Sequence, residues 1–173
     1  MRKSNKKGFT LVELVVVIAI IGVLAAILIP TMMNYVKKSR MRTANSNAKL
    51  VFESINNMAS DKVADGDAVS KISAAGVAVS SYKSSTDVLE KAVWEALKDN
   101  GENGAGYVAL SYDPNKKDAE NYVQWQTNKE TDDQITGQWP NAPKDVDAAE
   151  KLTFGKYNAT PGKTTTTNNG GNS

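Results

Sequence analysis

The sequence predicts an α+β fold: a long N-terminal α-helix with its C-terminal half packed against a small antiparallel β-sheet. The first observation is an apolar run over residues 9–29, followed by apolar residues spaced three and four apart as far as residue 60. This is the period of a helix. The second is a pair of segments, 107–112 and 121–127, with the β-branched and aromatic composition of strands. The third is the polar loop 113–120 between them, which predicts a hairpin.

The N-terminal helix is expected to span residues 9–60 in two parts. Residues 9–29 contain Glu13 as their only ionisable side chain and are long enough to cross the apolar core of a membrane as a transmembrane helix. Residues 31–60 are amphipathic. Pro30 lies between the two parts and predicts a kink rather than a stop, because proline removes one helical hydrogen bond and crowds the preceding turn. The apolar positions of the second part are Met41, Ala44, Ala48, Val51, Ile55 and Met58.

The globular head is expected to cover residues 61–159. Asp87 precedes a helical pattern of apolar residues, and Asn100-Gly101 follows it. These signals predict a short helix over residues 87–99. Three further elements are expected: a short helix near 67–75 that ends at Gly76, a third strand over 152–157, and a disordered tail over 160–173, where almost nothing is apolar.

The composition excludes most catalytic chemistry. The chain contains no cysteine and no histidine, which excludes disulfide bonds, thiolate and imidazole catalysis, and zinc sites with nitrogen or sulfur ligands. No pair of carboxylates has a context that argues for catalysis, so the chain is expected not to be an enzyme and to need no cofactor. The acidic residues considered for a calcium loop lack the twelve-residue ligand spacing; they are Asp113, Asp118, Glu120, Asp132 and Asp133.

Charge is distributed unevenly along the chain. Residues 1–8 carry four positive side chains, whereas residues 61–173 hold 12 positive and 17 negative ones. An acidic head is a poor general binder of nucleic acid, so no specific nucleic-acid partner is expected. The basic stretch Lys37-Lys38-Ser39-Arg40-Met41-Arg42 is interpreted as a solvated neck or as a site of pairing with the acidic head of another subunit. Anionic headgroups or DNA are the alternative partners.

The apolar run admits three interpretations from its residues alone. A secretory signal peptide would be cleaved near Ala25 and Ala26, but the run is longer than a usual signal core and has a carboxylate at its start. A plain membrane anchor explains the length, yet inserting Glu13 into a bilayer is unfavourable by up to about 3 kcal/mol. The third interpretation is a special device, because ionisable residues within membrane segments usually mark function.

The residues Lys7-Gly8-Phe9-Thr10-Leu11, followed by Glu13, an apolar stretch and Pro30, closely resemble the N-terminal signature of type IV pilins. The resemblance covers residues 1 to about 60. It implies that residues 1–8 are a cytoplasmic leader peptide, that a membrane prepilin peptidase cuts between Gly8 and Phe9, and that Phe9 is then N-methylated. Many pilins join their C-terminal region through two cysteines. This chain has none, so packing or hydrogen bonds must hold its final region.

Phe9 and Glu13 are expected to set the axial register between subunits. Cleavage after Gly8 would leave an amine on Phe9, four residues from Glu13, where the helix dipole also favours a carboxylate. If the amine of an incoming subunit pairs with Glu13 of its neighbour, wrong registers leave a buried charge unpaired and are penalised. The alternative is a snorkelling carboxylate without a partner. Gly22 and Pro30 bracket a stretch that is expected either to melt partly, as the resemblance implies, or merely to kink.

The resemblance implies a structural subunit of a type IV pilus, serving adhesion, aggregation or twitching motility. The expected partners are further copies in a helical filament, the prepilin peptidase, the pilus assembly platform with minor pilins, and the membrane before assembly. The precursor would be a single-pass protein of the inner membrane, and the filament would be extracellular on the cell surface. The alternatives are a major pseudopilin of a type II secretion system, a competence pilus for DNA uptake, and a monomeric membrane-tethered binding protein.

Overall fold

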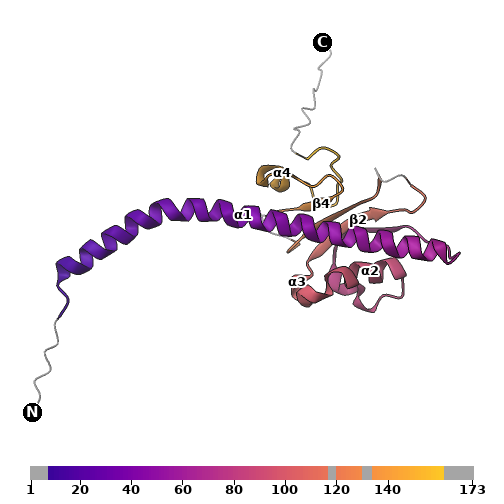
Figure 1. The fold of residues 1–173 in the computed structure, drawn as a ribbon, viewed down its shortest axis with the longest axis horizontal. Coiled ribbons are helices and arrows are strands. Elements are labelled where there is room, and N and C mark those ends of the chain that lie inside the picture. The colour runs from indigo at the N-terminus through magenta and orange to yellow at the C-terminus, as the bar shows by residue number, and fades with distance from the viewer. Residues whose placement is uncertain (1–7, 117–119, 130–133, 162–173) are drawn as a thin grey trace, which may run out of the picture. The chain divides into compact units, whose positions relative to one another are not determined.

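The computed structural model describes residues 8–116, 120–129 and 134–161. The chain divides into two units. The first ends at Lys37 and contains, among its described residues, only the first part of helix α1 (Leu11–Ala64); the second begins at Lys38 and contains the rest of α1 and every other element (Figure 1). Those elements are β1 (Ile72–Ala78), η1 (Val79–Ser84), α2 (Val88–Leu97), η2 (Lys98–Asn100), α3 (Gly101–Gly104), β2 (Tyr107–Tyr112), β3 (Tyr122–Gln126), β4 (Gly137–Trp139) and α4 (Val146–Glu150).

Helix α1 continues through Pro30 without a stop, as predicted, and ends at Ala64, four residues beyond the expected end. The hydroxyl of Thr31 supports the helix next to the proline. It donates to the carbonyl oxygen of Leu28 at 2.8 Å and lies 3.4 Å from that of Ile27. Threonine hydroxyls in helices commonly bond to carbonyl groups of the preceding turn in this way, and such bonds often accompany a bend.

The sheet is antiparallel throughout, with the strand order β1-β2-β3-β4. The predicted hairpin is confirmed as β2 and β3, and the predicted helix after Asp87 is confirmed as α2, with the Asp87 carboxylate accepting from the amides of Leu89 and Glu90. The predicted helix near 67–75 is wrong, because residues 67–71 have no regular structure and residues 72–75 belong to β1. Gly76 lies in a register irregularity of this strand with φ of +74°, so it marks a bulge rather than a helix end.

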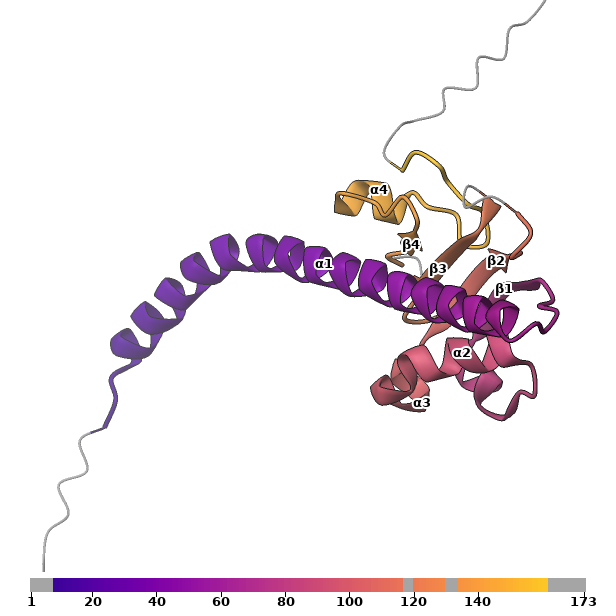
Figure 2. The same ribbon diagram turned by 45° about the vertical axis from the view of Figure 1, so that its right-hand side comes forward.

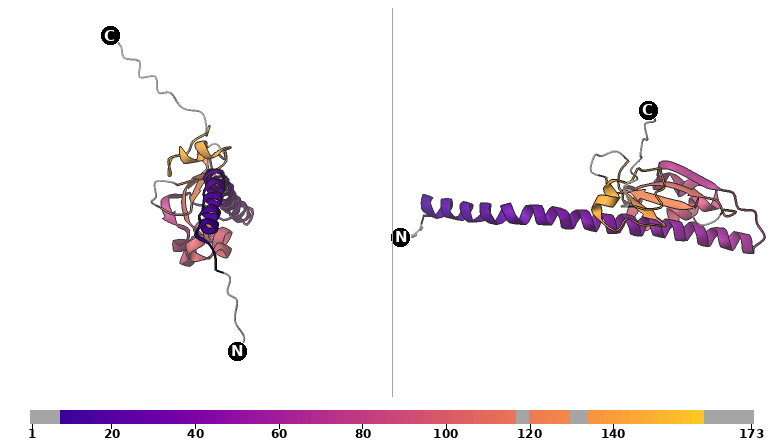
Figure 3. Two further views of the ribbon diagram at one scale, coloured as in Figure 1. Left: turned by 90° about the vertical axis from the view of Figure 1, so that its left-hand side faces the viewer. Right: turned by 90° about the horizontal axis from the view of Figure 1, so that it is seen from above.

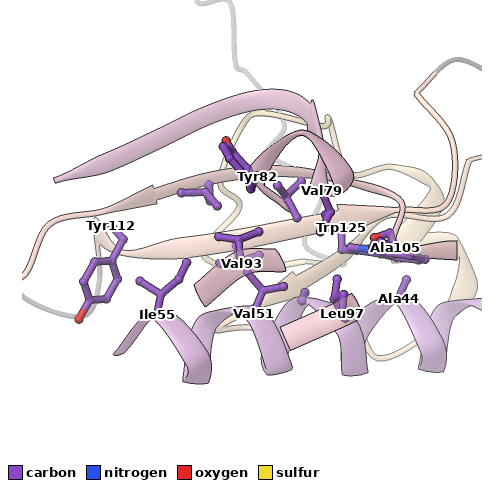
Figure 4. Close-up of a cluster of buried hydrophobic side chains, with 14 of the residues drawn as sticks. Ala44, Val51, Ile55, Val79, Tyr82, Val93, Leu97, Ala105, Tyr112 and Trp125 are labelled. Atoms are coloured by element: carbon purple, nitrogen blue, oxygen red, sulfur yellow. Dashed lines mark hydrogen bonds between the residues drawn. The ribbon is translucent and has the colours of Figure 1, made fainter. Parts of the chain in front are cut away.

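The second part of α1 and helix α2 cover one face of the sheet (Figure 2). The Ser54 hydroxyl of α1 donates to the carbonyl oxygen of Ala92 in α2 at 2.9 Å. Figure 4 shows α1 side chains pointing into a core that includes Trp125 and residues of α2. The buried apolar residues of α1 are Met41, Ala44, Ala48, Val51, Ile55 and Ala59; Met58, predicted as a core position, is only partly buried. The predicted α+β fold class is therefore confirmed.

The C-terminal segment covers part of the other face of the sheet (Figure 3). Residues 152–157, predicted as a strand, contain turns and no strand. They are held by two fully buried glutamines that lie opposite each other in β3 and β4, Gln124 and Gln138. The Gln124 side chain donates to the carbonyl oxygen of Lys156 and accepts from the amide of Gly155. The prediction that hydrogen bonds hold this region without cysteines is confirmed for these residues; the predicted tail lies almost entirely outside the described residues.

Candidate functional site

The first part of α1 exposes a long apolar surface within the single chain. No residue from Gly8 to Val36 is buried, and the exposed fraction of the Phe9 side chain reaches 84%. The most apolar 18-residue window of the helix has a mean hydropathy of 3.1, so α1 is long and apolar enough to cross a membrane. Isolated soluble proteins rarely expose apolar surface on this scale. This surface therefore requires a membrane or other protein chains around it.

Glu13 is held at the start of α1 by Thr10. The Glu13 Oε2 atom accepts from the Thr10 amide at 2.9 Å and from the Thr10 hydroxyl at 2.7 Å, while the Glu13 amide donates to the Thr10 hydroxyl oxygen at 3.3 Å. This is a capping box, in which residues three apart satisfy each other's free amides at a helix N-terminus. The carboxylate therefore has partners within its own chain, unlike the unpartnered snorkelling carboxylate considered above.

The sequence analysis did not assign Thr10 a role. The signal was present, because a threonine followed three residues later by a glutamate, just before an apolar run, is the sequence pattern of a capping box. The Oε1 atom of Glu13 takes part in no hydrogen bond within the described ranges. The arrangement leaves one carboxylate oxygen available at the N-terminal end of the helix, where the dipole favours negative charge.

Gly8 and Phe9 lie outside the regular part of α1 and are exposed. A Cβ atom added to Gly8 would meet nothing within 4 Å. The fold itself therefore does not need a glycine at this position. A peptidase that binds the backbone closely there would need one. The peptide bond between Gly8 and Phe9 is accessible, and its cleavage stays a prediction.

Gly22 and Pro30 both lie within continuous helix. A Cβ atom added to Gly22 also meets nothing within 4 Å, so this glycine is not required by contacts of its own chain. Its two physical consequences are a weaker helix and room for a close neighbour. Melting between Gly22 and Pro30 stays a prediction that concerns the assembled state.

The acidic residues considered for calcium do not assemble into a site among the described residues, where no group of three or more potential ligands occurs. Asp113 accepts from the amide of Asn115, and Glu120 pairs with Lys116. Asp118, Asp132 and Asp133 lie outside the described residues. No argument for a cation therefore arises from this part of the structure.

Comparison with known protein families assigns the N-terminal segment. Residues 3–29 match the model of the prokaryotic N-terminal methylation motif. The N-terminal segment is similar to that of type IV pilins. It is 57% identical over 44 residues to the fimbrial protein EcpC of Eikenella corrodens, and 59% identical over 39 residues to the type IV major fimbrial protein FimA of Dichelobacter nodosus. It is 40% identical over 58 residues to the type IV major pilin protein PilA of Myxococcus xanthus.

The similarity to these pilins is confined to part of each chain. The aligned segments cover 25%, 22% and 34% of this chain and 29%, 25% and 26% of the relatives' lengths, respectively. No solved structure matches the chain. The long N-terminal helix with a small antiparallel sheet is nevertheless consistent with a pilin fold.

Proposed function

We propose that this chain is the structural subunit of a type IV pilus and that it polymerises through its N-terminal helix into surface filaments. The observation that carries the proposal is the exposed apolar helix that begins with a capped carboxylate, Glu13, next to an accessible Gly8-Phe9 bond. The matches to a type IV major pilin and to major fimbrial proteins support it. The filament would serve adhesion, aggregation or twitching motility.

Processing would prepare the chain for assembly. A prepilin peptidase in the membrane would cut after Gly8 and release the leader, residues 1–8, on the cytoplasmic side. The new amine on Phe9 would then be methylated, which keeps its positive charge. The apolar part of α1 would hold the subunit in the membrane until an assembly platform, with minor pilins, transfers it into the filament on the cell surface.

Glu13 would then fix the axial position of each subunit. Thr10 occupies Glu13 Oε2 from within the chain, so Oε1 is left to accept the Phe9 amine of a neighbouring copy. In the apolar interior of a bundle, a charge that misses its partner costs several kcal/mol. Only the register that brings every amine to a carboxylate would avoid this cost. Thr10 would act as a positioning residue for Glu13.

The test is the substitution Glu13→Ala in the full chain, expressed in its own host. We expect the variant to be inserted and cleaved as well as the wild type, because removing a charge from an apolar segment makes insertion easier. Filaments in sheared surface material, counted by electron microscopy, should fall at least tenfold. Intact-mass analysis of the wild-type subunit should reveal loss of residues 1–8 and one added methyl group on Phe9.

Glu53→Ala is the matched control, because Glu53 is another exposed carboxylate of α1, paired only with Lys49 at 3.4 Å. It should leave filaments unchanged. Wild-type filament number in Glu13→Ala cells would refute the register role. A mature N-terminus near Ala26 in the wild type would instead indicate a secretory signal peptide and refute the pilin proposal as a whole.

A further inference from the structure

The second part of α1 carries opposite charges toward its two ends. Lys38 and Arg42 are near the start of this part, Asp61 is in the last turn of the helix, and Asp65 directly follows its last residue. All four residues are exposed. A helix C-terminus favours cations and disfavours carboxylates, because of the helix dipole. The two aspartates are therefore placed against the preference of their own helix, so its stability does not explain them.

Among the described residues, these four side chains form no ion pair within 4 Å and no side-chain hydrogen bond. Asp65 interacts electrostatically with Lys62, but the Lys62 ammonium bonds to another carboxylate. Two other cations of this part of the helix are occupied. Lys62 pairs with Asp67 at 2.8 Å, and Lys49 pairs with Glu53 at 3.4 Å and lies 5.0 Å from the centroid of the Trp139 ring.

The two pairs of charges lie on opposite flanks of α1. Successive residues of an α-helix are rotated by about 100°. Measured from the direction of the buried face, taken as the mean of Ala48 and Ile55, Lys38 and Arg42 lie about 90° to 130° to one side. Asp61 and Asp65 lie about 90° to 130° to the other side. A basic flank (Lys38 and Arg42) and an acidic flank (Asp61 and Asp65) therefore border the solvent-facing side of the same helix.

We propose that the basic flank of one subunit binds the acidic flank of a second copy that lies alongside it, displaced along the helix axis. Arg42 and Asp65 are 23 positions apart in the printed sequence, so the displacement that brings them together is about 35 Å at 1.5 Å per residue. The contact joins two different surfaces of the same chain. Such a head-to-tail contact does not close by a simple shift, and repeats as an open filament.

The inference rests on the proposed function, since it names a contact that the pilin filament would contain outside its apolar interior. Single exposed ion pairs are weak. Their expected effect is to select one axial displacement between copies. A copy with a different displacement places like charges opposite each other or leaves both flanks without partners. The contact would thus act together with Glu13 on axial register, but in the water-exposed layer, where salt screens it.

Arg40 separates this inference from binding to a membrane surface. It is exposed and lies between Lys38 and Arg42 in sequence, yet it is rotated by about half a turn from both. It lies on the same side of the helix as the acidic flank, but more than about 30 Å from it along the axis. Attraction to anionic headgroups depends on nearby positive charge and not on a flank. A subunit contact requires Lys38 and Arg42 and not Arg40, whereas headgroup binding requires all three alike.

The first experiment is a charge swap in the full chain. Reversal of the basic flank (Lys38→Glu with Arg42→Glu) and reversal of the acidic flank (Asp61→Lys with Asp65→Lys) should each lower the filament mass in sheared surface material at least tenfold. The subunit level in membranes should not change. The variant with all four substitutions should recover at least half of the wild-type filament mass. Arg40→Glu is the matched control and should lower it less than twofold.

The second experiment uses the absence of cysteine from the chain. Arg42→Cys together with Asp65→Cys should give a ladder of disulfide-linked multimers in oxidised filaments. Each single substitution should give none, because the two positions face each other only between different copies. The two sites are too far apart on one helix to join within a subunit.

The outcomes separate the two proposals. Wild-type cells without filaments would overturn the proposed function, and this inference with it. Filaments in the wild type that survive either reversal unchanged would overturn this inference alone. Equal losses in Arg40→Glu and in the basic-flank reversal, with no recovery in the fourfold variant, would overturn it in favour of headgroup binding. Recovery in the fourfold variant together with the ladder would support it.

Discussion

Gly137 lies where strand β4 crosses the backbone of α1. A Cβ atom at this position would lie 2.1 Å from both the carbonyl carbon and the carbonyl oxygen of Ala44, and 2.5 Å from the amide nitrogen of Asn45. These are backbone atoms of a helix and cannot rotate away. The Asn45 side chain fastens the same crossing, since it accepts from the Gln138 amide and donates to the carbonyl oxygen of Pro143. The glycine therefore sets how closely α1 approaches the sheet.

Gly137→Ala should lower the free energy of unfolding of the head by about 3 kcal/mol, the upper end of the usual cost of overpacking a core. The measurement is urea denaturation of the full chain in detergent. Tryptophan fluorescence reports on the head alone, because Trp94, Trp125 and Trp139 all lie in the second unit. Gly104→Ala is the control: its nearest neighbour would be 3.4 Å away, and we expect a change within about 0.5 kcal/mol. Equal stability of both variants would contradict the close approach.

Sequence reasoning assigned predicted roles to Glu13 and Gly8, but none to Thr10 or Gly137. Thr10 was within reach, because a capping box is a local pattern over four residues. Gly137 was not. Its role depends on a contact with Ala44, which lies 93 positions earlier in the printed sequence. No local pattern records how closely two distant backbones pass.

Strand β4 and the C-terminal segment are joined through Gln138. Its side-chain nitrogen donates to the carbonyl oxygens of Asn158 at 2.6 Å and Asn141 at 3.0 Å. Its side-chain oxygen accepts from the Asn158 amide at 3.0 Å and from Gln124 at 3.1 Å. Gln138 is fully buried. One neutral side chain thus connects three parts of the head that are separate in sequence.

Gln138→Leu should release the C-terminal segment. Leucine has a similar size but no polar atoms, so the Asn158 amide and the carbonyl groups would be left without partners, at roughly 1 to 3 kcal/mol for each buried group that water cannot reach. We expect a loss of about 3 kcal/mol in the free energy of unfolding. Hydrogen exchange of residues 154–158 should accelerate more than tenfold, as followed by mass spectrometry.

A paired substitution controls for the loss of a buried amide itself. Gln126 donates to the Thr136 hydroxyl at 2.7 Å, and both side chains are buried. Gln126→Leu with Thr136→Val removes donor and acceptor together, which is close to neutral when no group is left unpaired. If residues 154–158 keep their protection in Gln138→Leu, or lose it equally in the paired variant, Gln138 does not hold the segment.

The elements that the sequence predicted well are those with a strong local period or cap. Helix α1 has apolar residues at steps of three and four, α2 has the Asp87 cap, and β2 and β3 are rich in aromatic and β-branched residues. Strand β1 was predicted as helix because Ile72–Ala78 is mostly small residues, which leave alternation and helical spacing hard to tell apart. Three-residue β4 is too short to show any period.

The head should fold without the apolar part of α1. The core residues of α1 lie between Met41 and Ala59, and the second unit begins at Lys38. Deleting residues 1–35 should therefore leave a soluble, monomeric domain with one cooperative thermal transition. Size-exclusion chromatography with light scattering gives the mass, and circular dichroism gives the transition.

Two results would contradict the prediction that the head folds without residues 1–35. Aggregation of the shortened chain would mean that the head needs residues before Lys38 to complete its core. Near-ultraviolet circular dichroism without fine structure would indicate a loosely packed head. Single cooperative unfolding in a monomer would instead show that assembly requires the removed residues and that the stability of the head does not.

The C-terminal segment is held by hydrogen bonds of neutral amides, and this affects how the head responds to its surroundings. Thiol reductants break a disulfide, acid protonates a carboxylate, and high ionic strength weakens an exposed ion pair. None of these acts on an amide that bonds to backbone groups inside a protein. Closing the head in this way requires no oxidant, and the segment can detach and return without chemical repair. A head closed in this way keeps its C-terminal segment in place when redox conditions, acidity or salt change.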